Sequence, residues 1–454
     1  MLLSEYEFAI PPVPGHESLL AYFASRVPQY LPDGFLPVRF VVTRTGSDAY
    51  KCEVGGLSLV DWDQRPKPDS VFRFARRCVE NTDQFTTVLL VPTGVGAEIG
   101  GHAGDAAPVA RLLGQVSDRV ILHPNVVNAS DINEMPVNAL YVEGSIICRL
   151  LMGTIGLQPV RQNRVMVVID AHEDELFVNA AINAVSGARA SYGLACPEVV
   201  CLDPPVKLRA RFASSGRAAG RVEDFGGLCQ LLDKRRGEYD AVAVSSVVDV
   251  PEEYHQGYFD SKGEMVNPWG GVEAMLTHAL SIIYDVPTAH SPMFENRKIA
   301  NMDPGIVDPR MAAEAVSLTF LQCTLKGLQR SPRIITEPKT MDHPSVLTAE
   351  DVSCLVIPDG CLGLPTLAAL EQGIAVIAVR ESKNVMKNDL ASLPWRIGQF
   401  HRVENYWEAA GVIAAMRAGI TPESVRRPLP YTRVSIESLT EQPCVSVEPQ
   451  REGA

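Results

Sequence analysis

Two short histidine and carboxylate clusters in this 454-residue sequence have the composition of an acid–base site. His102 and Asp105 stand three residues apart, and Asp170 and His172 stand two apart with further acidic residues behind them. A histidine that a carboxylate orients can take up and release a proton near neutral pH. We therefore predict His102 and His172 as proton-transfer residues, with Asp105 and Asp170 as the carboxylates that orient them.

Other roles are open for the same residues. Asp105 could cap a helix, and Asp174 and Glu175 suit the positive end of a helix dipole. One histidine with two carboxylates could also bind a divalent cation, with His123 or Glu173 as an added ligand. The pattern does not identify a metal or another cofactor.

A glycine-rich loop directly precedes His102 and contains Gly94, Gly96, Gly100 and Gly101. Backbone N–H groups of such a loop, beside a helix predicted over 106–113, can bind a phosphate or a carboxylate. The spacing is not the dinucleotide fingerprint, and the loop lacks the Gly-Lys-Ser/Thr of a nucleotide phosphate loop. We expect a small anionic metabolite here; a purely structural tight turn is the alternative.

Further polar residues follow other apolar runs, and four of the nine histidines in the sequence fall at the ends of predicted strands. In an open parallel sheet the carboxyl ends of the strands form the ligand crevice. Besides the four glycines, the predicted substrate contacts are His123, Asn125, Asn267, Gly270, Gly271, His290, Ser291, Asp359, Gly360 and Arg380.

The elements that would position these residues are short, continuous apolar runs alternating with helical segments. Continuous runs are typical of strands buried on both faces of a parallel sheet. The fold class is therefore α/β, with layered, mostly parallel sheets and flanking helices. The runs lie at 87–91, 119–123, 165–170, 199–203, 241–245, 354–358 and 374–380.

Apolar spacing predicts an amphipathic helix from Gly271, and Asp308 followed by Pro309 predicts the start of another that runs to Leu328. The basic, glycine-containing segment 204–238 is predicted as a surface loop that precedes a helix around Leu228 to Lys234, or as an active-site lid. Residues 1–80 form a small N-terminal α+β subdomain, 81–430 the α/β core, and 431–454 a C-terminal tail. The core could divide into two lobes, 81–330 and 331–430.

Composition narrows the function classes. The chain has 41 Lys and Arg against 54 Asp and Glu, a net charge of −13, which argues against nucleic-acid and membrane-surface partners. Its ten cysteines include no C-x-x-C pair, and no apolar stretch reaches a membrane span. We expect a soluble, cytoplasmic protein, and a homodimer on the basis of size alone.

Four stretches together resemble a known family: Pro92 to Asp105, His123 to Gly144, Asn267 to Gly271, and Asp359-Gly360. They are similar to the bacterial and plant family called domain of unknown function 3326, over about residues 85–430. The resemblance implies a family but no activity, and residues 1–80 lie outside it.

These residues support three hypotheses. The first is an isomerase, lyase or hydrolase that performs acid–base chemistry on a small anionic metabolite. The second is a nucleotide-dependent transferase, because 359–381 resembles in arrangement the strand, loop, helix and strand of a nucleotide-sugar donor pocket. The third is a non-catalytic metabolite-binding protein.

Overall fold

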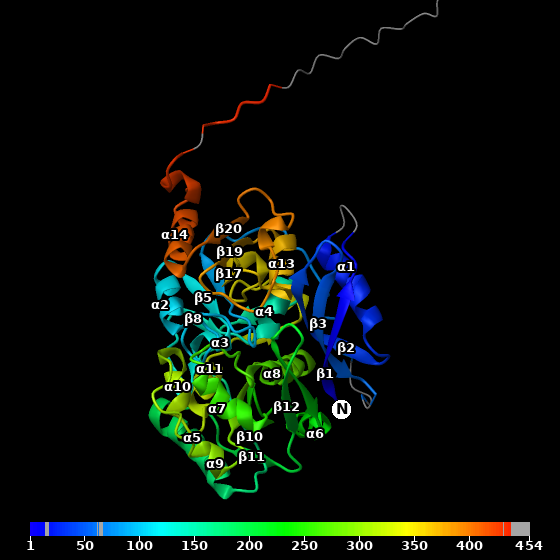
Figure 1. Ribbon diagram of the computed structural model, residues 1–454, viewed down its shortest axis with the longest axis vertical. Coiled ribbons are helices and arrows are strands. Elements are labelled where there is room, and N and C mark those ends of the chain that lie inside the picture. Colours follow the sequence, from blue (N-terminus) through cyan, green and yellow to red (C-terminus); the bar gives the residue numbers. More distant parts are fainter. Residues whose placement is uncertain (14–17, 61, 63–66, 430, 437–454) are drawn as a thin grey trace, which may run out of the picture.

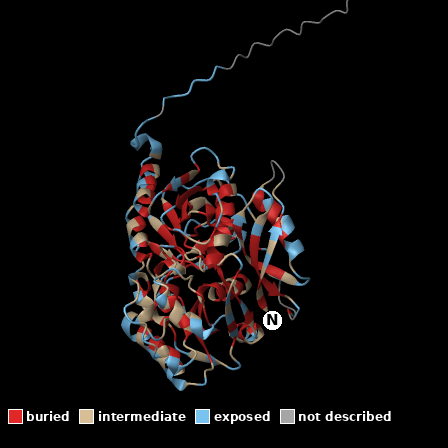
Figure 2. Cartoon of the chain, viewed as in Figure 1, coloured by how far each residue is buried: buried red, intermediate tan, exposed pale blue. Residues whose placement is uncertain are grey.

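The computed structural model describes residues 1–13, 18–60, 62, 67–429 and 431–436. It confirms the predicted α/β class, with two large sheets and helices against their faces (Figure 1). Both sheets have buried centres, and the exposed residues gather on the outer helices and loops (Figure 2). Strands such as β17 (Cys354–Pro358) and β19 (Ala375–Val379) are buried throughout because their sequences are continuous apolar runs.

One of the two large sheets has six strands, and all of them are parallel. Chain segments from both sides of residue 330 therefore share one sheet. The strands, in spatial order, are β20 (Phe400–Val403), β19 (Ala375–Val379), β17 (Cys354–Pro358), β4 (Thr86–Leu89), β5 (Arg119–Leu122) and β8 (Ala139–Tyr141).

Two pairs of packed helices flank this sheet. One pair is α2 (Ala107–Gln115) with α14 (Tyr406–Arg417), and the other is α4 (Gly144–Leu151) with α13 (Leu364–Gln372). The two pairs lie on opposite sides of the sheet in Figure 1.

The ten-stranded sheet is mixed. Its parallel part is β11 (Val199–Leu202), β10 (Val165–Asp170), β14 (Ala241–Asp249) and β15 (Thr288–Met293). Next to β14 it continues through β12 (Lys207–Phe212), β13 (Ala218–Glu223), β1 (Leu3–Ile10), β3 (Tyr50–Ser58), β2 (Phe35–Thr45) and β18 (Leu362–Gly363).

The predicted N-terminal α+β element contains β1, β2, β3 and α1 (Leu19–Arg26). Its strands are antiparallel to one another, and β1 pairs with β13. The N-terminal strands are therefore part of the same sheet as the core strands.

The prediction of a surface loop or lid is wrong for the first part of 204–238, whereas the helix predicted around Leu228 to Lys234 is confirmed. Strands β12 and β13 form an antiparallel hairpin inside the large sheet, followed by α6 (Phe225–Lys234). Arg217 of this segment is buried and contacts Glu5 and Glu53 across the sheet. Arg217 is buried, unlike the exposed Arg209, Arg211 and Arg221, because carboxylates from distant strands can satisfy a buried arginine.

Helix α8 (Gly270–Tyr284) confirms the helix predicted from Gly271 and packs against both β13 and β15. Helices α5 (Glu175–Tyr192) and α11 (Leu321–Gln329) pack together, and α11 packs against the parallel strands β10, β14 and β15. The continuous helix predicted from Pro309 to Leu328 is wrong. It is broken into η2 (Pro309–Met311), α10 (Ala312–Ala315) and α11, with Phe320 in the left-handed region at φ 51°.

In the described part of the chain, none of the helices combines the length and apolarity needed to cross a bilayer. Most of the predicted C-terminal tail, 437–454, lies outside the described residues.

Candidate functional site

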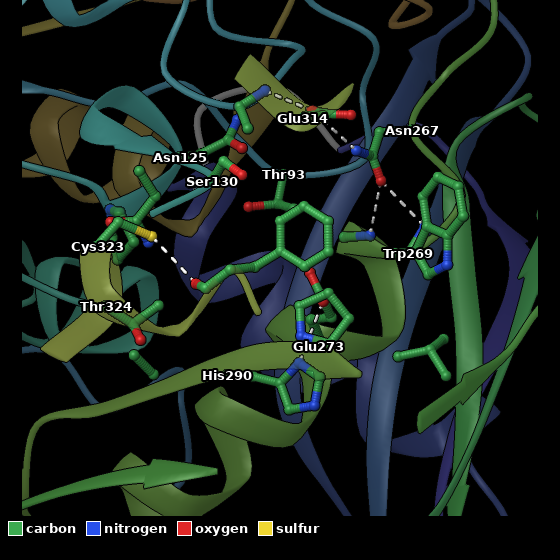
Figure 3. Close-up of a pocket in the computed structure, with 18 of the residues that line it drawn as sticks. Thr93, Asn125, Ser130, Asn267, Trp269, Glu273, His290, Glu314, Cys323 and Thr324 are labelled. Atoms are coloured by element: carbon green, nitrogen blue, oxygen red, sulfur yellow. Dashed lines mark hydrogen bonds and ion pairs between the residues drawn. The ribbon is translucent and has the colours of Figure 1, made fainter. Parts of the chain in front are cut away.

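A pocket of about 270 Å³ lies where the two large sheets meet. Part of its wall comes from the loops after β4, β5 and β8 of the six-stranded sheet. Another part comes from β14 and β15 of the ten-stranded sheet and from the start of α8. The segment 294–324 closes another side (Figure 3). The carboxyl ends of strands from both sheets thus converge on one pocket, as the strand-end rule predicts for each sheet alone.

A hydrogen-bonded chain of Ser246, His290 and Glu273 ends in this pocket. Ser246 Oγ lies 2.7 Å from His290 Nε2, and His290 Nδ1 lies 3.1 Å from Glu273 Oε1. Since the Glu273 carboxylate accepts from Nδ1–H, Nε2 is the ring nitrogen that accepts the serine proton in neutral His290. Among the described residues, the pocket lining includes His290 and Glu273 but not the fully buried Ser246.

A second carboxylate and histidine pair lines another wall. Glu143 caps α4 by accepting from the backbone N–H of Ser145 at 2.9 Å. Its other oxygen lies 3.3 Å from His278 Nδ1. His123 lies beside this pair and is 6% exposed, and burial followed by the neighbouring His278 lowers the pKa of His123 to about 3. His123 is therefore a neutral imidazole at physiological pH.

A third group surrounds Glu314. This carboxylate accepts from the backbone N–H of Ala103 at 2.6 Å and lies 3.5 Å from the Asn267 side-chain nitrogen (Figure 3). Desolvation in the pocket wall raises the pKa of Glu314 to about 7. Glu314 is therefore partly protonated near neutral pH and can give or take a proton.

Seven predicted contact residues line the pocket together. They come from four segments of the chain, and Asn125, Asn267 and His290 are labelled in Figure 3. The seven are Gly94, Gly101, His123, Asn125, Asn267, Gly270 and His290.

The four residues predicted as catalytic, in contrast, do not line the pocket in the described structure. His102 lies between two lining residues, but its Nδ1 is hydrogen-bonded to the buried Tyr258 hydroxyl at 2.7 Å. Burial lowers the pKa of His102. His172 uses both ring nitrogens in backbone contacts, with Asp174 N at 2.9 Å and Phe294 O at 3.0 Å. The two histidines flank the pocket without facing it.

Asp105 and Asp170 likewise do not orient these histidines through their side chains. Asp105 accepts from the backbone N–H of Gly100 at 2.9 Å, and Asp170 accepts from that of Val206 at 3.1 Å. Burial raises the pKa of each carboxyl group to about 7. The second oxygen of Asp170 is buried with no hydrogen-bond partner in the described structure.

The glycine-rich loop is explained by its backbone. Gly94 has a φ of +78°, and a Cβ there would lie 2.9 Å from the Ala218 carbonyl oxygen. A Cβ on Gly101 would lie 2.1 Å from the carbonyl oxygen of Ala97. Gly96 and Gly100 also have positive φ and lie outside the described pocket lining. Tight turns and close packing therefore account for these glycines.

The starts of the helices at the pocket are already capped by side chains. Asn267 accepts from the N–H groups of Trp269 and Gly270 at α8, Glu143 caps α4, and His123 caps the short α3 (Pro124–Val127). These caps occupy N–H groups that an anion would otherwise bind.

Most of the other predicted contact residues make packing contacts, hydrogen bonds or ion pairs within the protein. Ser291 donates to Thr319 O, and the close approach of Gly271 to Ala218 lets α8 pack on β13. Asp359 pairs with Arg402 at 3.1 Å and Arg380 with Glu404 at 3.0 Å. Among the described residues, the pocket lining contains neither these four residues nor Gly360.

The alternative of a divalent metal has no preformed donor set in the described residues, which bring no three His, Cys, Asp or Glu side chains together as ligands. The pocket lining also has no Lys or Arg among the described residues, whereas it has four glutamates: Glu143, Glu273, Glu295 and Glu314.

Glu143, Glu273 and His278 were missed as site residues from the sequence. Glu143 lies two residues after the end of β8, close to the strand-end position that marked His123. Glu273 and His278 lie on α8, most of whose side chains are buried. Polar residues within a helix that is apolar nearly all round are the signal that could have identified them.

Comparison with known proteins gives a family. The model of a family of proteins of unknown function, DUF3326, matches residues 86–426. A Synechococcus protein described as an uncharacterized lipoprotein is 33% identical over 367 residues, which cover 78% of this chain and 98% of that protein. No solved structure matches this chain. Because the family model spans most of the sequence, the chain belongs to the DUF3326 family.

Proposed function

We propose that this protein is an enzyme of the isomerase or lyase type that transfers a proton on a small uncharged or cationic metabolite. Glu273 would be the general base. The observation that carries this proposal is the hydrogen-bonded chain from buried Ser246 through His290 to Glu273, which ends on a carboxylate in the pocket.

The chain of hydrogen bonds suits a base. His290 holds one oxygen of Glu273, and in the described structure the other oxygen has no hydrogen bond and is available to a ligand. Glu273, an acceptor only, places the His290 proton on Nδ1, and Ser246 holds the ring through the opposite nitrogen. A positioned base of this kind contributes about 10²- to 10⁴-fold to a rate.

The charge of the pocket supports a ligand that is not an anion. Four glutamates line it, no Lys or Arg does so in the described structure, and the nearby helix starts are capped. An anionic group would enter without a cationic partner and face carboxylates. We therefore propose an uncharged or cationic substrate in place of the anionic one expected from the glycine-rich loop.

Ser246, His290 and Glu273 have the residue types of a hydrolase triad, but the serine is fully buried. A nucleophile must reach the substrate. Burial of Ser246 therefore favours a supporting role for this residue over a hydrolase.

Deuterium exchange tests the proposal. Small uncharged and cationic metabolites, together with anionic analogues, would first be screened by thermal shift. Each compound that binds would then be incubated with the protein in D₂O and its C–H signals followed by NMR. We expect exchange with the wild type and with Glu175→Gln, a change at an exposed glutamate. Exchange should be lost in Glu273→Gln with binding retained. Binding without exchange in the wild type would instead indicate a metabolite-binding protein.

Two further expectations become proposals. We propose a cytoplasmic location, because the nine described cysteines are free thiols, as in a reducing compartment. Cell fractionation tests this, and the description of the Synechococcus relative as a lipoprotein gives the competing expectation. A homodimer is proposed from size alone and is tested by light scattering.

A further inference from the structure

Two imidazoles meet over a glycine at the inner end of the pocket. A Cβ built on Gly144 would lie 3.0 Å from His123 Nε2 and 3.1 Å from His278 Nε2. Both Nε2 atoms therefore face the same small space above the first residue of α4. In the described structure neither Nε2 atom has a hydrogen-bond partner.

Backbone groups fix the tautomer of each ring. His123 Nδ1 lies 3.2 Å from the backbone N–H of Asn125, which can only donate, so the proton of neutral His123 is on Nε2. His278 Nδ1 contacts the Ala274 carbonyl oxygen, which can only accept, so Nδ1 carries a proton. Neutral His278 therefore has its lone pair on Nε2. The pair offers one hydrogen-bond donor and one acceptor side by side.

The two histidines are accessible from two cavities, and burial keeps His123 uncharged. Thr93, Ala274, His123 and His278 line both the main pocket and a second, largely apolar cavity of about 120 Å³. Glu143 lies against His278 Nδ1. Three arginines, Arg39, Arg149 and Arg217, line the second cavity, and each is paired with a carboxylate of the protein. A protonated His278 would raise the cost of a second charge on His123.

We infer that the His123 and His278 pair binds an α-hydroxycarbonyl group of an uncharged substrate. The carbonyl oxygen would accept from His123 Nε2–H, and the adjacent hydroxyl would donate to His278 Nε2. The inference rests on the proposed function in one respect: the α-hydroxycarbonyl is the group whose C–H proton Glu273 would remove.

Two chemical reasons select this group. It presents an acceptor on one carbon and a donor on the next, which matches the two ring nitrogens. It also has a C–H bond acidified by the carbonyl, and a neutral imidazole can stabilise the charge that develops on the carbonyl oxygen when that proton leaves. A carboxamide also offers an acceptor beside a donor, but its C–H bonds are much less acidic.

The experiment uses the full chain labelled with ¹⁵N-histidine and acetohydroxamic acid, an uncharged analogue with a carbonyl beside a hydroxyl. His123→Gln and His278→Gln assign the two rings. At pH 7 we expect His123 to be neutral and protonated at Nε2, and His278 to carry a proton on Nδ1.

The hydroxamate should shift both Nε2 signals and leave exposed His343 unchanged. Its O-methyl ester, which lacks the hydroxyl, should bind at least ten-fold more weakly. A charged His123, an Nδ1–H tautomer of His123, or unchanged Nε2 signals would overturn the inference.

Glu273→Gln separates this inference from the proposed function. If the hydroxamate shifts the Nε2 signals in this variant and substrate exchange is also retained, the proposed base is wrong and the histidine site stands. If exchange depends on Glu273 but the hydroxamate leaves both rings unchanged, the base stands and the histidine site is wrong.

Discussion

His290 Nε2 lies 2.7 Å from the hydroxyl oxygen of Ser246, a residue with no solvent exposure. The same ring contacts Glu273 in the pocket through Nδ1. A buried hydroxyl and a pocket carboxylate are therefore joined through one imidazole. Through His290, the buried Ser246 of β14 can therefore influence the position of Glu273, the proposed base.

Ser246→Ala should slow the proposed exchange reaction about ten-fold, because the ring of His290 loses one of its two anchors. The free energy of unfolding should fall by about 1 kcal/mol, the usual net contribution of a buried hydrogen bond. Exchange kinetics and urea unfolding measure the two effects. Complete loss of turnover in a folded variant would indicate that the serine is a nucleophile, contrary to our proposal.

Gly144→Ala should weaken acetohydroxamate binding about ten-fold or more, because the new methyl group would lie 3.0 to 3.1 Å from both imidazole nitrogens. Isothermal titration measures the loss. The matched control is Gly411→Ala in α14, where nothing lies within 4 Å of the added Cβ. That control should bind normally and gain up to about 1 kcal/mol of stability from helix propensity. Equal binding by both variants would show that the space above Gly144 is not used.

Asp170→Asn should stabilise the protein at pH 8 and have little effect at pH 4. Burial raises the pKa of Asp170 from 3.8 to about 7, so the folded state favours the protonated form. The stability associated with that proton is present below pH 4 and is lost as the pH rises through 7. The gain at pH 8 is on the order of 4 kcal/mol. Denaturant unfolding from pH 4 to 8 measures the difference, and a gain independent of pH would contradict the prediction.

Arg217→Leu should lower the free energy of unfolding by about 3–5 kcal/mol, because it leaves Glu53 buried without its cationic partner and leaves Glu5 with Arg39 alone. Arg221→Leu, in the adjoining strand β13, is the control. Its pair with Glu223 is half exposed and should contribute less than about 1 kcal/mol. Guanidinium unfolding compares the two variants. Similar losses in both would show that the buried network does not stabilise the sheet.

Much of the fold could be predicted from the sequence because the signals are local. Continuous apolar runs such as 354–358 specify strands buried on both faces, and their order with helices between them predicts an α/β layer. A different local signal, the basic residues, gave a wrong prediction for the first part of 204–238. There, basic residues suggested a loop, whereas Arg217 is neutralised by carboxylates from β1 and β3, which no local pattern reports.

The candidate site was predictable only as a set of strand-end positions. That rule placed His123, Asn125 and His290 in the pocket lining, and the loop before the helix predicted from Gly271 added Asn267. The same rule, however, assigned proton transfer to His102 and His172. The types and spacing of those two histidines suit catalysis. Their ring nitrogens, however, bind Tyr258 and backbone groups from distant segments.

The sequence by itself determined the α/β class, most of the buried strands and the family, since each depends on residues that are neighbours along the chain. Only the tertiary structure decided which polar groups share the pocket. Glu143, Glu273, His278 and His290 meet there because β8 and β15 end at facing edges of two different sheets and α8 packs between them. Proton-transfer chemistry depends on which ring nitrogen faces which oxygen, and side chains from distant segments acquire that relation only when the sheets have packed.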